Sequence, residues 1–227
     1  EFPLVSARDS STWLGMTMSY VELHCCSAFS FLRGGSFPEQ LAQVAAELEM
    51  PATALLDRNG VYGAQRFSVA AREHAIRPII GAELLIEDGS ILPVLVENRT
   101  GYKNLCELLT QAHLRSEKGK CAVRWDELPE FADGLVALLN ASLINCRASV
   151  SDANPRRLTE TPYKLIAALI DAFRRKNLFV ELQRHFIRGE ERINRELIDV
   201  ARAHRLPLVA TNGVQYARSY GREVLDV

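Results

Sequence analysis

The 227-residue sequence lacks a long apolar run, a large net charge of either sign and a C-x-x-C cysteine pair. No apolar stretch approaches the roughly 20 residues that a membrane-spanning helix needs, so we expect no membrane partner. The formal net charge of −1 gives no global basic field of the kind that marks many nucleic-acid-binding proteins. That balance does not exclude DNA, because a small module can belong to a larger DNA-handling protein.

The five cysteines do not form a disulfide pattern. Their number is odd, and Cys25 and Cys26 are adjacent, so their side chains point to opposite faces of an extended chain. This usage is typical of a reducing compartment, and we expect a cytoplasmic protein.

Residues 1–19 differ in character from the rest of the chain. They lack the apolar core of a secretory signal and contain Ser, Thr, Asp and Gly without a period. Two interpretations stay open. The segment is either non-native, with Met16 or Met18 as the true start, or a disordered N-terminus.

From residue 20 onward, strand patterns alternate with helix patterns. Ser36, Pro38 and Glu39 have the spacing of a capping box, which predicts that Ser36 caps the first helix. Asp88-Gly89 predicts a hairpin turn. Strands are expected at 20–25, 51–57, 77–87, 90–98, 135–140, 178–183 and 206–212; helices are expected near 38–48 and at 61–75, 101–114, 163–176 and 189–204; a loop is expected at 146–160.

Repeated strand-then-helix units predict parallel strands, arranged either as a small α/β barrel or as a doubly wound sheet. Polar residues follow the predicted strands at their carboxyl ends. In a barrel these ends converge on one face, which favours the barrel over the open sheet. The residues concerned are His24, Asp57, Glu83, Asn140, Glu181, His185 and Asn212.

Three stretches together carry a resemblance to a known family. They are VELHCCSAFSFLRGGS (21–36), ALLDRNGVYGAQRF (54–67) with RPIIGAEL (77–84), and FVELQRH (179–185) with LPLVATNGVQYA (206–217). In this order they resemble the PHP (polymerase and histidinol phosphatase) domain of bacterial DNA polymerase III alpha subunits. SAFSFLRGGS, DRNGVYG and VATNGVQYA are most similar to the error-prone branch. The resemblance covers residues 20–227.

The resemblance implies a distorted barrel of seven βα units, in agreement with the pattern of strands and helices. Intact members of the family hold a metal cluster with His, Asp, Glu and Cys ligands at the strand ends, and such clusters hydrolyse phosphoesters. Six positions of the present sequence match that set and are the remnant ligands if any metal binds: His24, Cys26, Asp57, Glu83, Glu181 and His185.

Other family positions are substituted. Cys26 stands where a second His is expected, and Ala141 stands where a Cys is expected. Arg33 and Arg58 replace an Asp and a His, while Gly213 and Gln215 replace the closing Asp-x-His, so four ligand positions carry non-ligands.

Arginine is permanently cationic and repels a divalent metal. We therefore predict that Arg58, and with it Arg33, pairs with Asp57, Glu83 or Glu181 in place of a metal. No cofactor and no catalytic residue are expected. A reduced zinc or manganese site made by His24, Cys26, Glu83 and His185 stays open as the alternative.

The leading functional hypothesis is a structural module of an error-prone DNA-directed DNA polymerase, a nucleotidyltransferase of DNA replication and repair. Its partners would be the rest of the polymerase chain, DNA through that parent protein, and other replication or mutagenesis proteins. The alternatives are a residual metal-dependent phosphoesterase or 3′–5′ exonuclease and a stand-alone protein-interaction domain. The fragment alone is not expected to extend a primer.

Overall fold

The computed structural model describes residues 20–117, 119–145 and 161–225. The N-terminal segment 1–19 and the loop predicted at 146–160 lie outside the described residues. No helix in the described ranges is long and apolar enough to cross a membrane.

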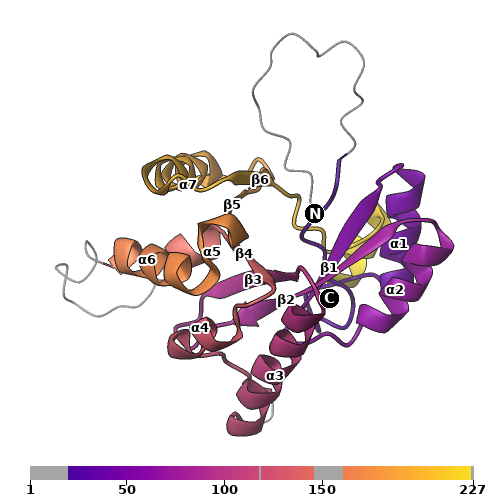
Figure 1. Ribbon diagram of the computed structural model, residues 1–227. Helices are drawn as coiled ribbons and strands as arrows, with labels where there is room; N and C mark the ends of the chain where they lie inside the picture. Colours follow the sequence, from indigo (N-terminus) through magenta and orange to yellow (C-terminus); the bar gives the residue numbers. More distant parts are fainter. Residues whose placement is uncertain (1–19, 118, 146–160, 226–227) are drawn as a thin grey trace.

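Six strands form one sheet in chain order and curl into a partial barrel (Figure 1). The strands are β1 Ala52–Arg58, β2 Arg77–Leu85, β3 Ile91–Val96, β4 Leu135–Leu139, β5 Leu178–Leu182 and β6 Leu208–Ala210. The strand β3 runs antiparallel to both neighbours, and the other pairs are parallel. The β2–β3 pair confirms the predicted hairpin, in which Gly89 takes a left-handed φ of 84° that suits glycine.

The strand predicted at 20–25 is wrong as a regular strand. Residues 21–26 make only two isolated bridges, Glu22 with Thr53 of β1 and Cys25 with Val214 beyond β6. The segment still occupies the position of a seventh barrel strand, because it lies between β1 and the chain that follows β6. A regular ladder is interrupted since the Glu22 carboxylate accepts hydrogen bonds from the backbone amides of His24 (2.8 Å) and Asn212 (2.9 Å).

The five predicted helices are present, with ends shifted by a few residues, and three short helices at 128–131, 141–145 and 222–225 were not predicted. The helices are α1 Pro38–Glu47, α2 Ala64–Glu73, α3 Arg99–Arg115, α4 Leu128–Phe131, α5 Ala141–Asn145, α6 Thr161–Phe173, α7 Glu190–His204 and α8 Arg222–Leu225, with short 3-10 turns at Trp125–Glu127, Arg175–Asn177 and Ser219–Gly221. Leu105, Leu108, Leu109 and Ala112 recur at helical spacing in the sequence and form the face of α3 that is buried in the core with the sheet. Burying one such leucine stabilises the fold by about 1.5–3 kcal/mol.

The predicted capping box at Ser36 is wrong by one residue. Phe37 is the N-cap of α1, and its backbone amide donates to the side chain of Gln40 (2.9 Å). The Ser36 hydroxyl instead accepts a hydrogen bond from the backbone amide of Ala217 (2.9 Å). Ser36 therefore ties the start of α1 to the chain beyond β6, a long-range contact that local spacing does not report.

Candidate functional site

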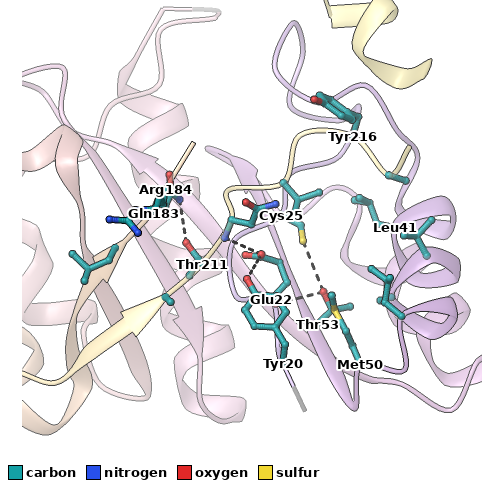
Figure 2. Close-up of a pocket in the computed structure, with 18 of the residues that line it drawn as sticks. Tyr20, Glu22, Cys25, Leu41, Met50, Thr53, Gln183, Arg184, Thr211 and Tyr216 are labelled. Atoms are coloured by element: carbon teal, nitrogen blue, oxygen red, sulfur yellow. Dashed lines mark hydrogen bonds between the residues drawn. The ribbon is translucent and has the colours of Figure 1, made fainter. Parts of the chain in front are cut away.

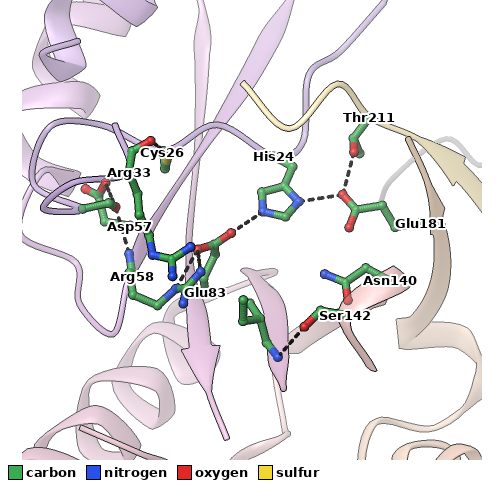
Figure 3. A network of polar contacts seen from close by, with 12 residues as sticks. His24, Cys26, Arg33, Asp57, Arg58, Glu83, Asn140, Ser142, Glu181 and Thr211 are labelled. Atoms are coloured by element: carbon green, nitrogen blue, oxygen red, sulfur yellow. Dashed lines mark hydrogen bonds and ion pairs between the residues drawn. The ribbon is translucent and has the colours of Figure 1, made fainter. Parts of the chain in front are cut away.

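The carboxyl ends of the strands bring most of the predicted polar residues to one cavity of about 370 Å³ (Figure 3). Glu83 comes from β2, Glu181 from β5, and His24 from the closing segment 21–26. Asn140 and Ala141 contribute from the chain just after β4, and Arg33 and Arg58 also line the cavity. The convergence predicted for a barrel is confirmed for these residues.

His24 lies at the centre of a chain of buried contacts. Its Nδ1 is 2.7 Å from Glu181 Oε1 and its Nε2 is 2.8 Å from Glu83 Oε1. Burial alone would lower the pKa of His24, but the carboxylates of Glu181 and Glu83 together raise that pKa to about 10. His24 is therefore an imidazolium at neutral pH and donates from both nitrogens.

Arg58 forms the ion pair that the sequence predicts. Its Nε and Nη2 both contact Glu83 Oε2, at 2.8 and 2.7 Å. The pairing follows from strand register, because Arg58 of β1 lies directly beside Glu83 of β2. Burial raises the pKa of Glu83, but His24 and Arg58 outweigh it and hold the pKa below its ordinary value, so Glu83 is ionised.

Asp57 forms no ion pair with an arginine of the described residues and is bound by serines instead. Its Oδ1 accepts from the Ser27 amide (2.8 Å) and the Ser30 hydroxyl (2.8 Å), and the Ser27 hydroxyl lies 2.9 and 3.0 Å from Oδ1 and Oδ2. Ser27 and Ser30 were not predicted as site residues. The signal was the Ser-x-x-Ser spacing in SAFS, which only gains meaning once the loop folds over β1.

Glu181 has one carboxylate oxygen that is hydrogen-bonded and one that is not. Its Oε1 contacts His24 and accepts from the Thr211 hydroxyl (2.5 Å) and Gln183 Nε2 (3.2 Å). Its Oε2 is buried and has no hydrogen-bond partner in the described structure. Thr211 and Gln183 belong to the network but were not predicted from the sequence.

The Cys26 thiol is engaged by a backbone carbonyl group. Its Sγ lies 3.5 Å from the carbonyl oxygen of Arg33, to which it donates. Burial first, and then the charges of Glu83 and Asp57, raise the pKa of the Cys26 thiol to about 12. The thiolate that binds metals is therefore scarce at neutral pH.

None of the remaining predicted positions has a side-chain hydrogen bond or ion pair with His24 among the described residues. His185 is exposed and lies outside the cavity, with its Nε2 2.8 Å from the carbonyl oxygen of Asn212. Gly213 has a φ of 58°, and the Gln215 backbone carbonyl accepts from Gly35 (2.7 Å). Arg33 lines the cavity but forms no ion pair with a carboxylate of the described ranges, so its predicted pairing is not seen.

A second, larger groove of about 690 Å³ lies outside the barrel between α1 and α7 (Figure 2). Glu22 lies in its wall, where its Oε2 accepts from the Tyr20 hydroxyl at 2.6 Å. Burial raises the pKa of Glu22. The Glu22 carboxylate accepts hydrogen bonds from the backbone amides of His24 and Asn212, so we assign Glu22 a structural role in closing the barrel.

The residues of the first cavity do not fit a metal cluster. Both nitrogens of His24, both oxygens of Glu83 and both oxygens of Asp57 are already engaged by protein groups. Arg58 adds a fixed positive charge against Glu83. Among residues 20–117, 119–145 and 161–225, no group of three or more His, Cys, Asp or Glu side chains has the arrangement of a metal site.

The model of the PHP domain family matches residues 22–185. The chain belongs to the PHP domain family. It is homologous to the N-terminal region of error-prone DNA polymerases. The one from Mycolicibacterium paratuberculosis is 36% identical over 213 residues, with 88% of this chain and 19% of the relative covered. The one from Cutibacterium acnes is 36% identical over 217 residues, with 89% and 19% covered. The present PHP domain thus spans about a fifth of the length of these relatives.

Two solved structures share the fold of this PHP domain. A protein from Bifidobacterium adolescentis assigned as a metal-dependent phosphoesterase aligns with a TM-score of 0.56 at 14% identity, covering 87% of this chain and 88% of the other. An amidohydrolase from Chromobacterium violaceum, with bound sulfate and no metal, aligns with a TM-score of 0.57 at 14% identity, covering 86% and 87%. At this identity the likeness establishes the barrel-like fold alone, as the sequence predicts.

Proposed function

We propose that this PHP domain is a non-catalytic structural part of an error-prone DNA polymerase. The observation that carries the proposal is the contact of His24 with both Glu83 and Glu181, extended by Arg58 on Glu83. In this arrangement protein cations take the positions that metal ions would need. The carboxylates that would hold a metal are neutralised from within the chain.

The electrostatics oppose metal entry. Two unit charges about 4 Å apart interact by roughly 4 kcal/mol at an effective dielectric near 20, and a divalent ion doubles that term. A metal at Glu83 would have to displace His24 and Arg58 or accept repulsion from both. We accordingly assign no metal ligand and no catalytic residue to the remnant positions.

The parent protein supplies the chemistry in this proposal. Nucleotidyl transfer and contacts with other replication or mutagenesis proteins are assigned to a longer polymerase chain, because this chain spans only 19% of an error-prone DNA polymerase relative. A cytoplasmic location is consistent with the free Cys25, Cys26, Cys106 and Cys121.

Metal content tests the proposal. The chain is purified without chelator, equilibrated with zinc and manganese, desalted, and analysed by elemental mass spectrometry. We expect a metal-to-chain ratio near zero that His24→Ala leaves unchanged. A stoichiometric metal that disappears in His24→Ala, but not in the exposed control His74→Ala, would contradict the proposal.

A second candidate is residual metal-dependent phosphoesterase or 3′–5′ exonuclease activity. The observation that favours it is the unpartnered Oε2 of Glu181, a buried oxygen with a free lone pair beside His24. It predicts manganese- or zinc-dependent release of nucleotides from a 3′-labelled oligonucleotide, lost in His24→Ala. Background hydrolysis that is independent of metal and of this substitution would dispose of it.

A further inference from the structure

Two loops at the mouth of the first cavity carry the same residue pattern. Residues 31–34 read Phe-Leu-Arg-Gly and residues 186–189 read Phe-Ile-Arg-Gly. One loop follows the closing segment 21–26 and the other follows β5. Arg33 from the first loop and Arg188 from the second both line the cavity, so the two loops border one opening.

The apolar side chains of both loops are unusually exposed. Phe31 and Leu32 are 83% and 79% exposed, and Phe186 and Ile187 are 89% and 65% exposed. Leu32 and Phe186 also have positive φ values of 59° and 60°, a conformation that bulky residues rarely adopt. The two loops, 31–34 and 186–189, form what we call the rim of the cavity. They expose four large apolar side chains to solvent, and exposed apolar patches mark binding surfaces.

The arginines of the two loops have no carboxylate partner among the described residues. Neither Arg33 nor Arg188 forms an ion pair within the part of the chain that the structure describes. Among the carboxylates that line the same cavity, Glu83 and Glu181 are neutralised by His24 and Arg58, and Glu190 accepts hydrogen bonds from the backbone and ring of His185. The two loop guanidinium groups therefore remain for an anionic ligand.

We propose that these two loops form a binding site for single-stranded nucleic acid. Phe31 and Phe186 stack on bases, and Arg33 and Arg188 contact phosphates on either side of the cavity. Exposed aromatic rings interleaved with arginines suit a flexible strand, because every base has a flat face and every linkage has a phosphate. The site holds no array of groups for reading base edges, so binding is independent of sequence.

The choice of nucleic acid over another polyanion rests on the proposed polymerase role, but the site needs no metal. Fluorescence anisotropy with a 5′-labelled oligo-dT of about 12 nucleotides, in EDTA, tests it directly. We expect Phe31→Ala and Phe186→Ala each to weaken binding about 5- to 100-fold. With two phosphate contacts, the slope of log affinity against log salt is about −1.4, and it falls toward zero in Arg33→Gln/Arg188→Gln.

Two control variants test whether the loss of binding is specific to the two loops or follows from removing any exposed aromatic ring or arginine. Tyr102→Ala removes an exposed aromatic ring on α3, and Arg192→Gln removes an exposed arginine on α7, and both should bind as the unaltered chain does. Thermal melting verifies that the rim variants fold.

Three outcomes would overturn the proposal. They are absence of saturable binding, unchanged affinity in the Phe31→Ala/Phe186→Ala double variant, and equally tight binding of duplex DNA. Absence of saturable binding is the result expected if the two loops instead bind a polypeptide partner. Failure of the structural role would appear separately, as stoichiometric metal in the metal-content measurement, since the anisotropy is measured without metal.

Discussion

His24 is the side chain on which the buried charges of the cavity depend. It separates Glu83 from Glu181, and its removal leaves two carboxylates near one another with less compensation. We expect His24→Ala to lower the free energy of unfolding by about 3–5 kcal/mol, the usual cost of breaking a buried charge pair. Urea unfolding measures the change. His74→Ala, on an exposed helix end, should change stability by less than about 0.5 kcal/mol. Equal losses in both variants would contradict this assignment.

The same residue sets a pH dependence. The folded-state pKa of His24 is about 10, above its ordinary value of 6.5. The folded state therefore holds the proton more tightly, and the resulting stability is complete below pH 6.5 and is lost as the pH rises toward 10. The limiting slope is about 1.4 kcal/mol per pH unit. Urea unfolding between pH 6 and 10 should show this decline, and His24→Gln should flatten it. A decline of the same size in His24→Gln would assign it to another group.

At the scale of elements, closure of the barrel depends on Glu22. The segment 21–26 makes two isolated bridges in place of a ladder, and Glu22 accepts from the amides of His24 and Asn212 across the gap. Glu22→Ala removes the acceptor of the buried His24 amide and of the part-buried Asn212 amide, so we expect a loss of about 1–3 kcal/mol. Glu22→Gln keeps one acceptor oxygen and should lose less.

Hydrogen exchange locates that loss. The amides of Ala54 and Val214 donate to the carbonyl groups of Glu22 and His24, so both should exchange faster in Glu22→Ala. Glu47→Ala, which removes an exposed partner of Arg218, should leave their protection unchanged. Loss of protection confined to α3 would argue against a closing role for Glu22.

At the scale of the whole molecule, residues 22–185 match the PHP domain family, and the chain covers 19% of the error-prone DNA polymerase from Mycolicibacterium paratuberculosis. We expect the purified 227-residue chain not to extend a labelled primer on a template with magnesium and all four deoxynucleotides. Gel analysis of the primer measures this. Extension that co-purifies with the chain through two different columns would refute the assignment of nucleotidyl transfer to the longer protein.

Local sequence patterns predict the six strands of the sheet, the five longer helices and the β2–β3 hairpin. These depend on local periodicity and turn chemistry, which each stretch of chain carries within itself. The sequence also predicts that Arg58 pairs with a carboxylate, because a permanently charged arginine among acidic side chains is stabilised by an opposite charge. The polar residues at the strand ends favour a barrel, and the family motifs support the same fold.

Which carboxylate each cation contacts depends on how distant segments of the chain pack together. The register of β1 on β2 gave Arg58 to Glu83, the fold of the 27–30 loop gave Asp57 to serines, and closure at residues 21–26 replaced a predicted strand by side-chain contacts. His185 lay outside the cavity although its motif is retained. Such choices depend on distances between segments far apart in the chain, which local patterns do not encode.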